Sequence, residues 1–499
     1  FYSKIISFAY IIARKFAFYK YILLWYPWFV AIPHRFFFPR RRGKIPQKRM
    51  SNSMTQTQNL TSGPIARQLV TLALPLLIGN ILQQFYNTID SFIVGRYVGL
   101  GAFAAIGIAG TVMNLFVFVL SGFCAGISII LAQFFGRDDF AGFRQEVWLA
   151  TALGVGGTAV ISLIGFAAMS PLLRLIQTPA DLRVLVAGYL RIIFLGLVTT
   201  YLYNLCASAL RSAGNSAAAL AALAVAMAAN LVLDLLFVVR FGMGVEGAAL
   251  ATVLAQLLSV ILCVIYWKTR FPHLMCGPAD LKYDHQLAAQ SANYGLVSAL
   301  HQSSLYIGKL LVQGAVNSMG TQVIAAYTAT TRIEGFANSF GDSGSAALSI
   351  FVAQNEGAGK RERTQQGFRI GFGLMMGLVL TISVIMALLA APCSALLIGS
   401  GQEASVASAV GYLRLISVFY FLCFTGNVFV GYYRGRGMVQ VPVIGTCLHI
   451  TVRVILSYLL AGRMGLRAVA LATGIGWMFV VLYHSSVYRR LRKQDAAAQ

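Results

Sequence analysis

Apolar segments of about 20 residues or more recur along this chain from residue 66 to residue 488. That is the length an α-helix needs to cross the hydrocarbon core of a bilayer, which is about 30 Å thick. Of the 499 residues, 58% are hydrophobic and only 11% are charged, too few to cover the surface of a soluble protein of this size. Most segments also lack the polar face of an amphipathic helix. The chain is therefore predicted to be an all-α, multi-pass membrane protein.

The apolar segments number twelve and fall into two sets of six. A polar linker, residues 268–285, separates the sets, and no loop is long enough to fold as a soluble domain. The predicted spans are 67–94, 102–134, 146–169, 183–210, 216–239, 247–267, 286–316, 322–355, 370–391, 405–433, 439–461 and 468–488. We therefore expect an N-lobe at residues 54–267 and a C-lobe, ending in a basic tail, at 286–499.

The net charge of +24 would suit a nucleic-acid partner, but its distribution argues against one. Basic residues gather in short loops on one side, with clusters at 360–363 and 489–493. The positive-inside rule then places both termini in the cytoplasm, as in a protein of a bacterial inner (cytoplasmic) membrane. The seven cysteines include no CxxC pair and are interpreted as small membrane residues, not as disulfides or metal ligands.

Residues 1–53 differ from the rest of the chain. The first 49 contain no Asp or Glu and are dense in Phe, Tyr, Lys and Arg, and a polar stretch follows from Met50. These residues show neither the order of regions found in a signal peptide nor a cleavage site. We therefore interpret the segment as translated upstream sequence, with a natural start of the protein at Met50 or Met54. The alternative is a basic, aromatic helix lying on the membrane surface.

The two halves repeat each other. With a shift of 221 residues, the segment from Ser128 to Gly136 falls on that from Ser349 to Gly357, both reading Ser-Ile-x-x-Ala-Gln-x-x-Gly. With a shift of 223, Gly214 falls on Gly437. Six spans separate equivalent points, so the copies enter the membrane in the same orientation. Parallel repeats of this kind are typical of transporters with a substrate site between the lobes.

These motifs, together with Gln83-Gln84-Phe-Tyr-Asn-Thr-Ile-Asp90 in the first span, resemble the multidrug and toxic compound extrusion (MATE) family over residues 60–490. The resemblance implies a bundle of twelve helices in a 6+6 arrangement. It also implies efflux of organic cations, driven by inward flow of Na+ or H+, without a cofactor.

An ionised carboxylate inside an apolar span costs free energy unless it is paired, hydrated or ligated, so each such residue calls for a structural or functional explanation. Asn230 and Asp234 are four residues apart and share one helix face, and Asp90 and Thr252 lie in other spans. Such oxygen ligands could hold a small cation, and the carboxylates could instead take up protons. In the resembling family, residues of these types and spacings form a cation site in the first lobe. The structural alternative is that Asp90 only braces neighbouring helices.

The second half departs from a family branch with acidic residues in spans 7 and 10. Its polar residues are instead His301 and Lys309 in span 7, and Arg332, Glu334 and Asp342 in span 8. One interpretation is that Lys309 and the three charges in span 8 neutralise one another; the other places Glu334 or Asp342 beside a cationic substrate. The residues expected to line the substrate cleft are Gln84, Tyr86, Asn87, Tyr203, Asn204, His301, Glu334 and Asp342.

The leading hypothesis is thus a secondary efflux antiporter that exchanges an organic cation for Na+ or H+, monomeric in the lipid membrane. A flippase of lipid-linked saccharides is the alternative, since related two-lobe bundles have that activity. A membrane-embedded enzyme is disfavoured, because the chain has no Asp-rich metal motif, HExxH or Walker A pattern.

Overall fold

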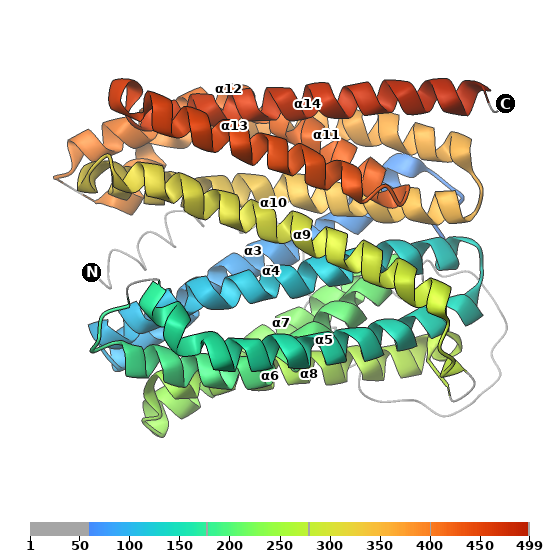
Figure 1. The fold of residues 1–499 in the computed structure, drawn as a ribbon, viewed down its shortest axis with the longest axis horizontal. Helices are drawn as coiled ribbons and strands as arrows, with labels where there is room; N and C mark the ends of the chain where they lie inside the picture. Colours follow the sequence, from blue (N-terminus) through green and yellow to red (C-terminus); the bar gives the residue numbers. More distant parts are fainter. Residues whose placement is uncertain (1–58, 176–177, 278–279, 400, 498–499) are drawn as a thin grey trace, which may run out of the picture. The chain divides into compact units, whose positions relative to one another are not determined.

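The structure is a computed structural model that describes residues 59–175, 178–277, 280–399 and 401–497, and side chains except those at 86–92, 100, 175 and 496–497. The expected extension at residues 1–53 lies outside this part. Eleven predicted spans each coincide with one long helix, and the span 216–239 is covered by a helix and the π-helical turn that continues it (Figure 1). The first six are α3 (Ile65–Tyr97), α4 (Leu100–Gly136), α5 (Phe140–Leu175), α6 (Arg183–Ser212), α7 (Ser216–Asp234) and α8 (Gly244–Arg270). The second six are α9 (His285–Asn317), α10 (Thr321–Gly357), α11 (Arg361–Ile398), α12 (Glu403–Gly435), α13 (Gln440–Met464) and α14 (Leu466–Ala497).

Ten of these helices are long and apolar enough to cross a membrane, judged over the residues that the structure describes. The other two, α9 and α10, are less apolar because they carry the polar residues expected in spans 7 and 8. They are nevertheless the helices that contact the first lobe most: α4 packs along α9 and α10, and α10 also packs on α3. The two helices that lack a sufficiently apolar segment are therefore the ones packed against the other lobe.

The lobes have separate apolar cores. One core joins α4, α5, α6 and α8, while the other is built mainly from α10, α11 and α12. Leu69 and Leu72 of α3 pack into the second core, although α3 belongs to the first repeat. Helix α3 also packs on α7, so it bridges the two lobes.

Glycines in left-handed backbone conformations confirm the internal repeat. Gly99 before α4 has φ 117° and ψ 176°, and Gly320 before α10 has φ 96° and ψ 166°, a region that essentially only glycine adopts. These positions are 221 residues apart. The pairs Gly214/Gly437 and Gly244/Gly465 also have matching positive φ values, 78° and 77°, and 60° and 54°. The 6+6 arrangement therefore extends to the loop backbones.

The repeated Ala-Gln-x-x-Gly motif lies where the C-terminal ends of α4 and α10 cross. A Cβ added to Gly136 would lie 2.7 Å from the carbonyl carbon of Gln354, and one added to Gly357 would lie 2.8 Å from that of Gln133. Real Cβ atoms essentially never approach other atoms below 3.0 Å. Glycine is thus required on both helices. We call this end of the bundle, defined by Gln133–Gly136 and Gln354–Gly357, the crossing end.

The segment before α3 joins the lobes at the crossing end. Gln354 is fully buried and accepts a hydrogen bond from the Leu60 backbone N–H at 3.0 Å, while its amide donates to the Ser212 carbonyl at 2.7 Å. Arg363 of α11 donates to the Gly63 carbonyl at 2.8 Å. One side chain of the second repeat therefore holds two backbone segments of the first.

Candidate functional site

The expected cation site lies at a break in helix geometry. Helix α7 ends at Asp234, and a π-helical turn, η1 (Leu235–Arg240), continues directly from it. π-turns inside helices often occur at functional sites. Nothing in the apolar residue pattern of 216–239 indicated this change, so the sequence predicted one uninterrupted span.

Asn230 and Asp234 are both buried, each with 1% of its surface exposed. The side-chain amide of Asn230 has no hydrogen-bond partner among the described residues. A buried amide without partners costs about 1–3 kcal/mol, so a polar group retained there needs a reason. Its oxygen is a suitable ligand for a small hard cation.

The other two predicted residues of this site are on neighbouring helices. Thr252 is half-buried on α8, which packs against α7, and its hydroxyl donates to the Ala248 carbonyl at 3.0 Å. Asp90 lies in α3, which packs against α7, α8 and η1, and its side chain lies outside the described part. The fold thus brings together the three helices that carry the four residues.

In the second lobe, Glu334 on α10 is buried and bonded to two tyrosines of α12. Its carboxylate accepts from the Tyr412 hydroxyl at 3.1 Å and from the Tyr420 hydroxyl at 3.4 Å. Arg453 on α13 donates to Tyr327 at 3.5 Å and is one of the cations whose charge acts on Glu334. Neither tyrosine was predicted as a partner of Glu334, because their contacts with it depend on the packing of α12 on α10.

Mutual neutralisation of Lys309, Arg332, Glu334 and Asp342 stays a prediction, and the charge of Lys309 acts on both carboxyl groups. Within the described residues no ion pair joins any two of them. Arg332 is exposed and Glu334 is buried two residues away, because positions i and i+2 point to different sides of a helix. Asp342 is exposed, and the cations acting on it are Lys309 and Arg434.

The residues expected to line a substrate cleft occupy different environments. His301 is buried, with 7% exposed, and the Nδ1 atom has no partner among the described residues. Gln84 is exposed, whereas Tyr203 and Asn204 are half-buried, and the Asn204 amide donates to the Thr200 carbonyl at 2.8 Å. The side chains of Tyr86 and Asn87 lie outside the described part. Their joint role as a cleft lining stays a prediction.

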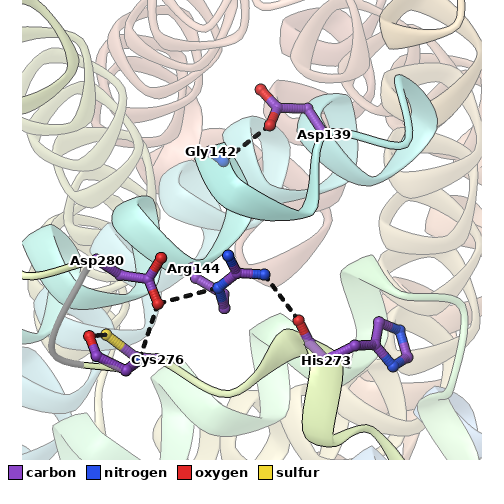
Figure 2. A network of polar contacts seen from close by, with 7 residues as sticks. Asp139, Gly142, Arg144, His273, Cys276 and Asp280 are labelled. Carbon is purple, nitrogen blue, oxygen red and sulfur yellow. Dashed lines mark hydrogen bonds and ion pairs between the residues drawn. The ribbon is translucent and has the colours of Figure 1, made fainter.

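The linker between the lobes is bonded to the first lobe (Figure 2). The guanidinium of Arg144, near the start of α5, pairs with Asp280 at 3.0 Å and donates to the His273 carbonyl at 2.9 Å. The Gly277 backbone N–H also donates to Asp280, at 2.8 Å. That backbone bond and the Arg144 guanidinium hold the pKa of the Asp280 carboxyl below its usual range.

The lowered pKa gives a pH-dependent prediction for the linker. Because the native carboxyl binds its proton more weakly than the unfolded one, the tether is complete above the ordinary Asp pKa of about 4 and is lost as pH falls through the lower native value. In the wild type, the protection of peptides spanning 271–284 from deuterium exchange, corrected for the chemical exchange rate at each pH, should therefore fall in acid. Asp280→Asn should show the lower protection already at neutral pH and no further fall in acid. Asp139→Asn, in the neighbouring loop, is the control. Equal exchange in Asp280→Asn and the wild type would contradict the tether.

Comparison with known proteins identifies the architecture. The family model described as MatE matches the chain twice, at residues 75–236 and 297–459. These ranges fall in the two repeats. A protein named "Probable multidrug resistance protein YpnP" from Bacillus subtilis is 27% identical over 422 residues, covering 84% of this chain and 94% of that protein.

Two further similarities concern a relative and a solved structure. A protein named "FAD transporter" from Shewanella oneidensis is 26% identical over 353 residues, covering 69% of this chain and 76% of its own length. The structure titled "Outward-facing conformation of a multidrug resistance MATE family transporter of the MOP superfamily" superimposes with a TM-score of 0.80 at 22% identity, covering 89% of this chain and 98% of that one.

Proposed function

Because the chain belongs to the MATE family of multidrug efflux transporters, we propose that it is a secondary antiporter that exports organic cations in exchange for inward Na+ or H+. The observation that carries the coupling is the buried pair Asn230 and Asp234 at the junction of α7 with the π-turn. A polar pair kept in an apolar helix, beside the helix that bears Asp90, supports a site for the coupling ion.

The second proposal concerns orientation. With both termini in the cytoplasm, the crossing end faces the cytoplasm and the ion site, near the end of α7, lies in the outer half of the membrane. The basic cluster at residues 360–363, beside the crossing end, supports this placement in a bacterial inner membrane. The contacts between Gly136 and Gly357 and the opposite helices then close the cytoplasmic side.

Coupling follows from a difference in ion affinity between two lobe arrangements. An ion shifts the equilibrium only if it binds one arrangement more tightly. Helix α3 contacts α7 of its own lobe and α10 and α11 of the other, so a change at the ion site reaches the second lobe through it. Ion binding is thereby linked to the lobe arrangement that admits or releases the substrate.

The substrate is proposed to be a small amphipathic organic cation. The exposed carboxylate of Asp342 and the buried carboxylate of Glu334 support a positively charged substrate. A flippase for lipid diphosphates would instead need a cleft lined mainly by basic side chains. The lipid-saccharide flippase is thus disfavoured.

The test is transport by the purified full chain in lipid vesicles. We expect accumulation of a fluorescent organic cation to follow an imposed Na+ or H+ gradient and to collapse when that gradient is dissipated. Imposing each gradient alone identifies the coupling ion. Transport that ignores both gradients, or that requires a lipid diphosphate, would refute the antiporter.

A further inference from the structure

A buried carboxyl outside the ion site lies between the lobes at the crossing end. Glu146 on the second turn of α5 is fully buried. Its two carboxyl oxygens lie 2.8 and 2.7 Å from the hydroxyl oxygen of Ser291, on the second turn of α9. Helix α5 belongs to the first repeat and α9 to the second, so this contact crosses the lobe boundary.

The hydrogen-bond pattern requires one more proton than an ionised Glu146 supplies. The Ser291 oxygen is also 2.7 Å from the Leu287 carbonyl oxygen, so one hydroxyl proton faces three acceptor oxygens. If the carboxyl carries a proton, it donates to Ser291, and Ser291 donates to Leu287. The carboxyl group and the Leu287 carbonyl are then each joined to Ser291 by a proton, and only the second carboxyl oxygen lacks one of its own. If the carboxyl is ionised, one proton serves all three contacts, so two of them join oxygens with no proton of their own.

The surroundings also favour a neutral carboxyl. The residues packed between α4, α5 and α9 here include Ile130, Leu149, Leu287 and Ala288, all buried. An ionised carboxylate in such a site costs several kcal/mol unless a cation compensates it. Within the described part of the chain, no Lys, Arg or His forms an ion pair with Glu146.

The charged and titratable neighbours on each packed element are otherwise engaged. Arg144, two residues earlier on α5, pairs with Asp280 of the linker. From α6, the Tyr201 hydroxyl donates to the Ala150 carbonyl, and from α9, Tyr294 packs on the apolar cluster. Helix α4 contributes Ile130 and Phe134 there. A proton is therefore the remaining way to neutralise the site.

We propose that Glu146 is a proton-binding site between the lobes that must hold a proton for the crossing end to close. Separation of α5 from α9 hydrates the carboxyl, which releases its proton to water at the crossing end; closure takes one proton back. The site is six residues from the start of α5, about 9 Å along the helix, so the path to water is short. A low proton concentration at this end then favours the open arrangement.

This inference rests on the proposed alternation between two lobe arrangements, and distances across the crossing end test it. Arg270 of α8 and Arg361 of α11 are exposed at that end, one in each lobe. Spin labels on Arg270→Cys and Arg361→Cys, with the exposed Cys447 replaced by Ser, report the separation in the purified full chain. We expect the population of long distances to grow as pH rises from about 5 to about 9.

The decisive variant is Glu146→Gln, which keeps the shape of the carboxyl and is permanently neutral. Its amide donates to Ser291 as the protonated acid does, so we expect short distances at every pH. Glu146→Asp, which retains a titratable group, should keep the pH-dependent change. A change in Glu146→Gln equal to that of the wild type would overturn the proposal.

Infrared spectroscopy supplies a readout that does not depend on lobe movement. The carbonyl stretch of a protonated carboxyl should be present in the wild type at neutral pH and weaker in Glu146→Gln; an unchanged band would overturn the assignment. Asp234→Asn separates the two proposals, because it should lose coupled transport and keep the pH-dependent distances. If vesicle transport follows a gradient while wild-type distances ignore pH, the antiporter stands and the Glu146 site fails.

Discussion

Replacing Asp234 with Asn is expected to reduce gradient-driven efflux by more than about tenfold. The substitution keeps the volume of a side chain that is 1% exposed, but removes the negative charge that would hold a cation or accept a proton. Without a bound ion, the coupling free energy between the ion site and the lobe arrangement is lost. Such coupling free energies between linked sites are typically about 1–3 kcal/mol. Substrate binding measured without a gradient should persist, since Asp234 is not expected in the substrate cleft.

The measurement is accumulation of a fluorescent cation in vesicles that contain equal amounts of folded protein. Asp181→Asn serves as the matched control, because Asp181 is an exposed aspartate just before α6, at the end of the bundle where α7 finishes. It should transport like the wild type. Full gradient-driven accumulation by Asp234→Asn would show that the coupling ion binds elsewhere.

Asn230 should matter less than Asp234, because a neutral amide contributes a ligand oxygen without charge. Asn230→Ala is expected to weaken the ion dependence of transport, raising the ion concentration for half-maximal rate, while the maximal rate changes little. The substitution also removes an amide that has no hydrogen-bond partner among the described residues. The free energy of unfolding should therefore fall less than it would if a hydrogen-bonded amide were removed.

The second large effect is expected at the crossing of α4 and α10. In Gly136→Val or Gly357→Val, the new side chain would overlap the backbone of the opposite helix, where even a Cβ comes within 2.7–2.8 Å of a glutamine carbonyl carbon. A backbone contact cannot yield as a flexible side chain can. The helices must separate, so the crossing end cannot close and transport should be nearly abolished.

The equivalence of the two repeats makes this prediction sharp. Because Gly136 and Gly357 contact each other's helix in the same way, either substitution alone should suffice, and combining them should add little. Gly373→Val is the matched control: it lies in α11, and a Cβ there would meet no atom within 4 Å. Membrane insertion and transport are measured for the three single variants and for the Gly136→Val/Gly357→Val double variant. Normal transport by Gly136→Val would mean that closure of this crossing is not part of the cycle.

The sequence by itself determined the membrane spans, their repeat and the family. The hydrocarbon core demands about 20 apolar residues per span, and within the described residues each predicted span falls on a long helix, α7 being continued by its π-turn, because that requirement is local to each segment. The duplicated Ala-Gln-x-x-Gly motif was also visible, since its copies lie 221 residues apart and read alike. So was the unequal distribution of acids: the residues 221 beyond Asp90, Asn230 and Asp234 are Leu311, Thr451 and Ile455.

Only the tertiary structure decided what those residues contact. It showed that the duplicated glycines bring the two lobes together, that tyrosines of α12 bond to Glu334, and that Glu146 meets Ser291 across the lobe boundary. At the start of a predicted span, Glu146 gave no sign that it would be buried. The physical reason is that apolar content and periodicity reflect the bilayer around each helix, whereas the partner of a polar side chain depends on which other helix packs against it. Those partners lie 78 residues apart for Glu334 and Tyr412 and 145 for Glu146 and Ser291.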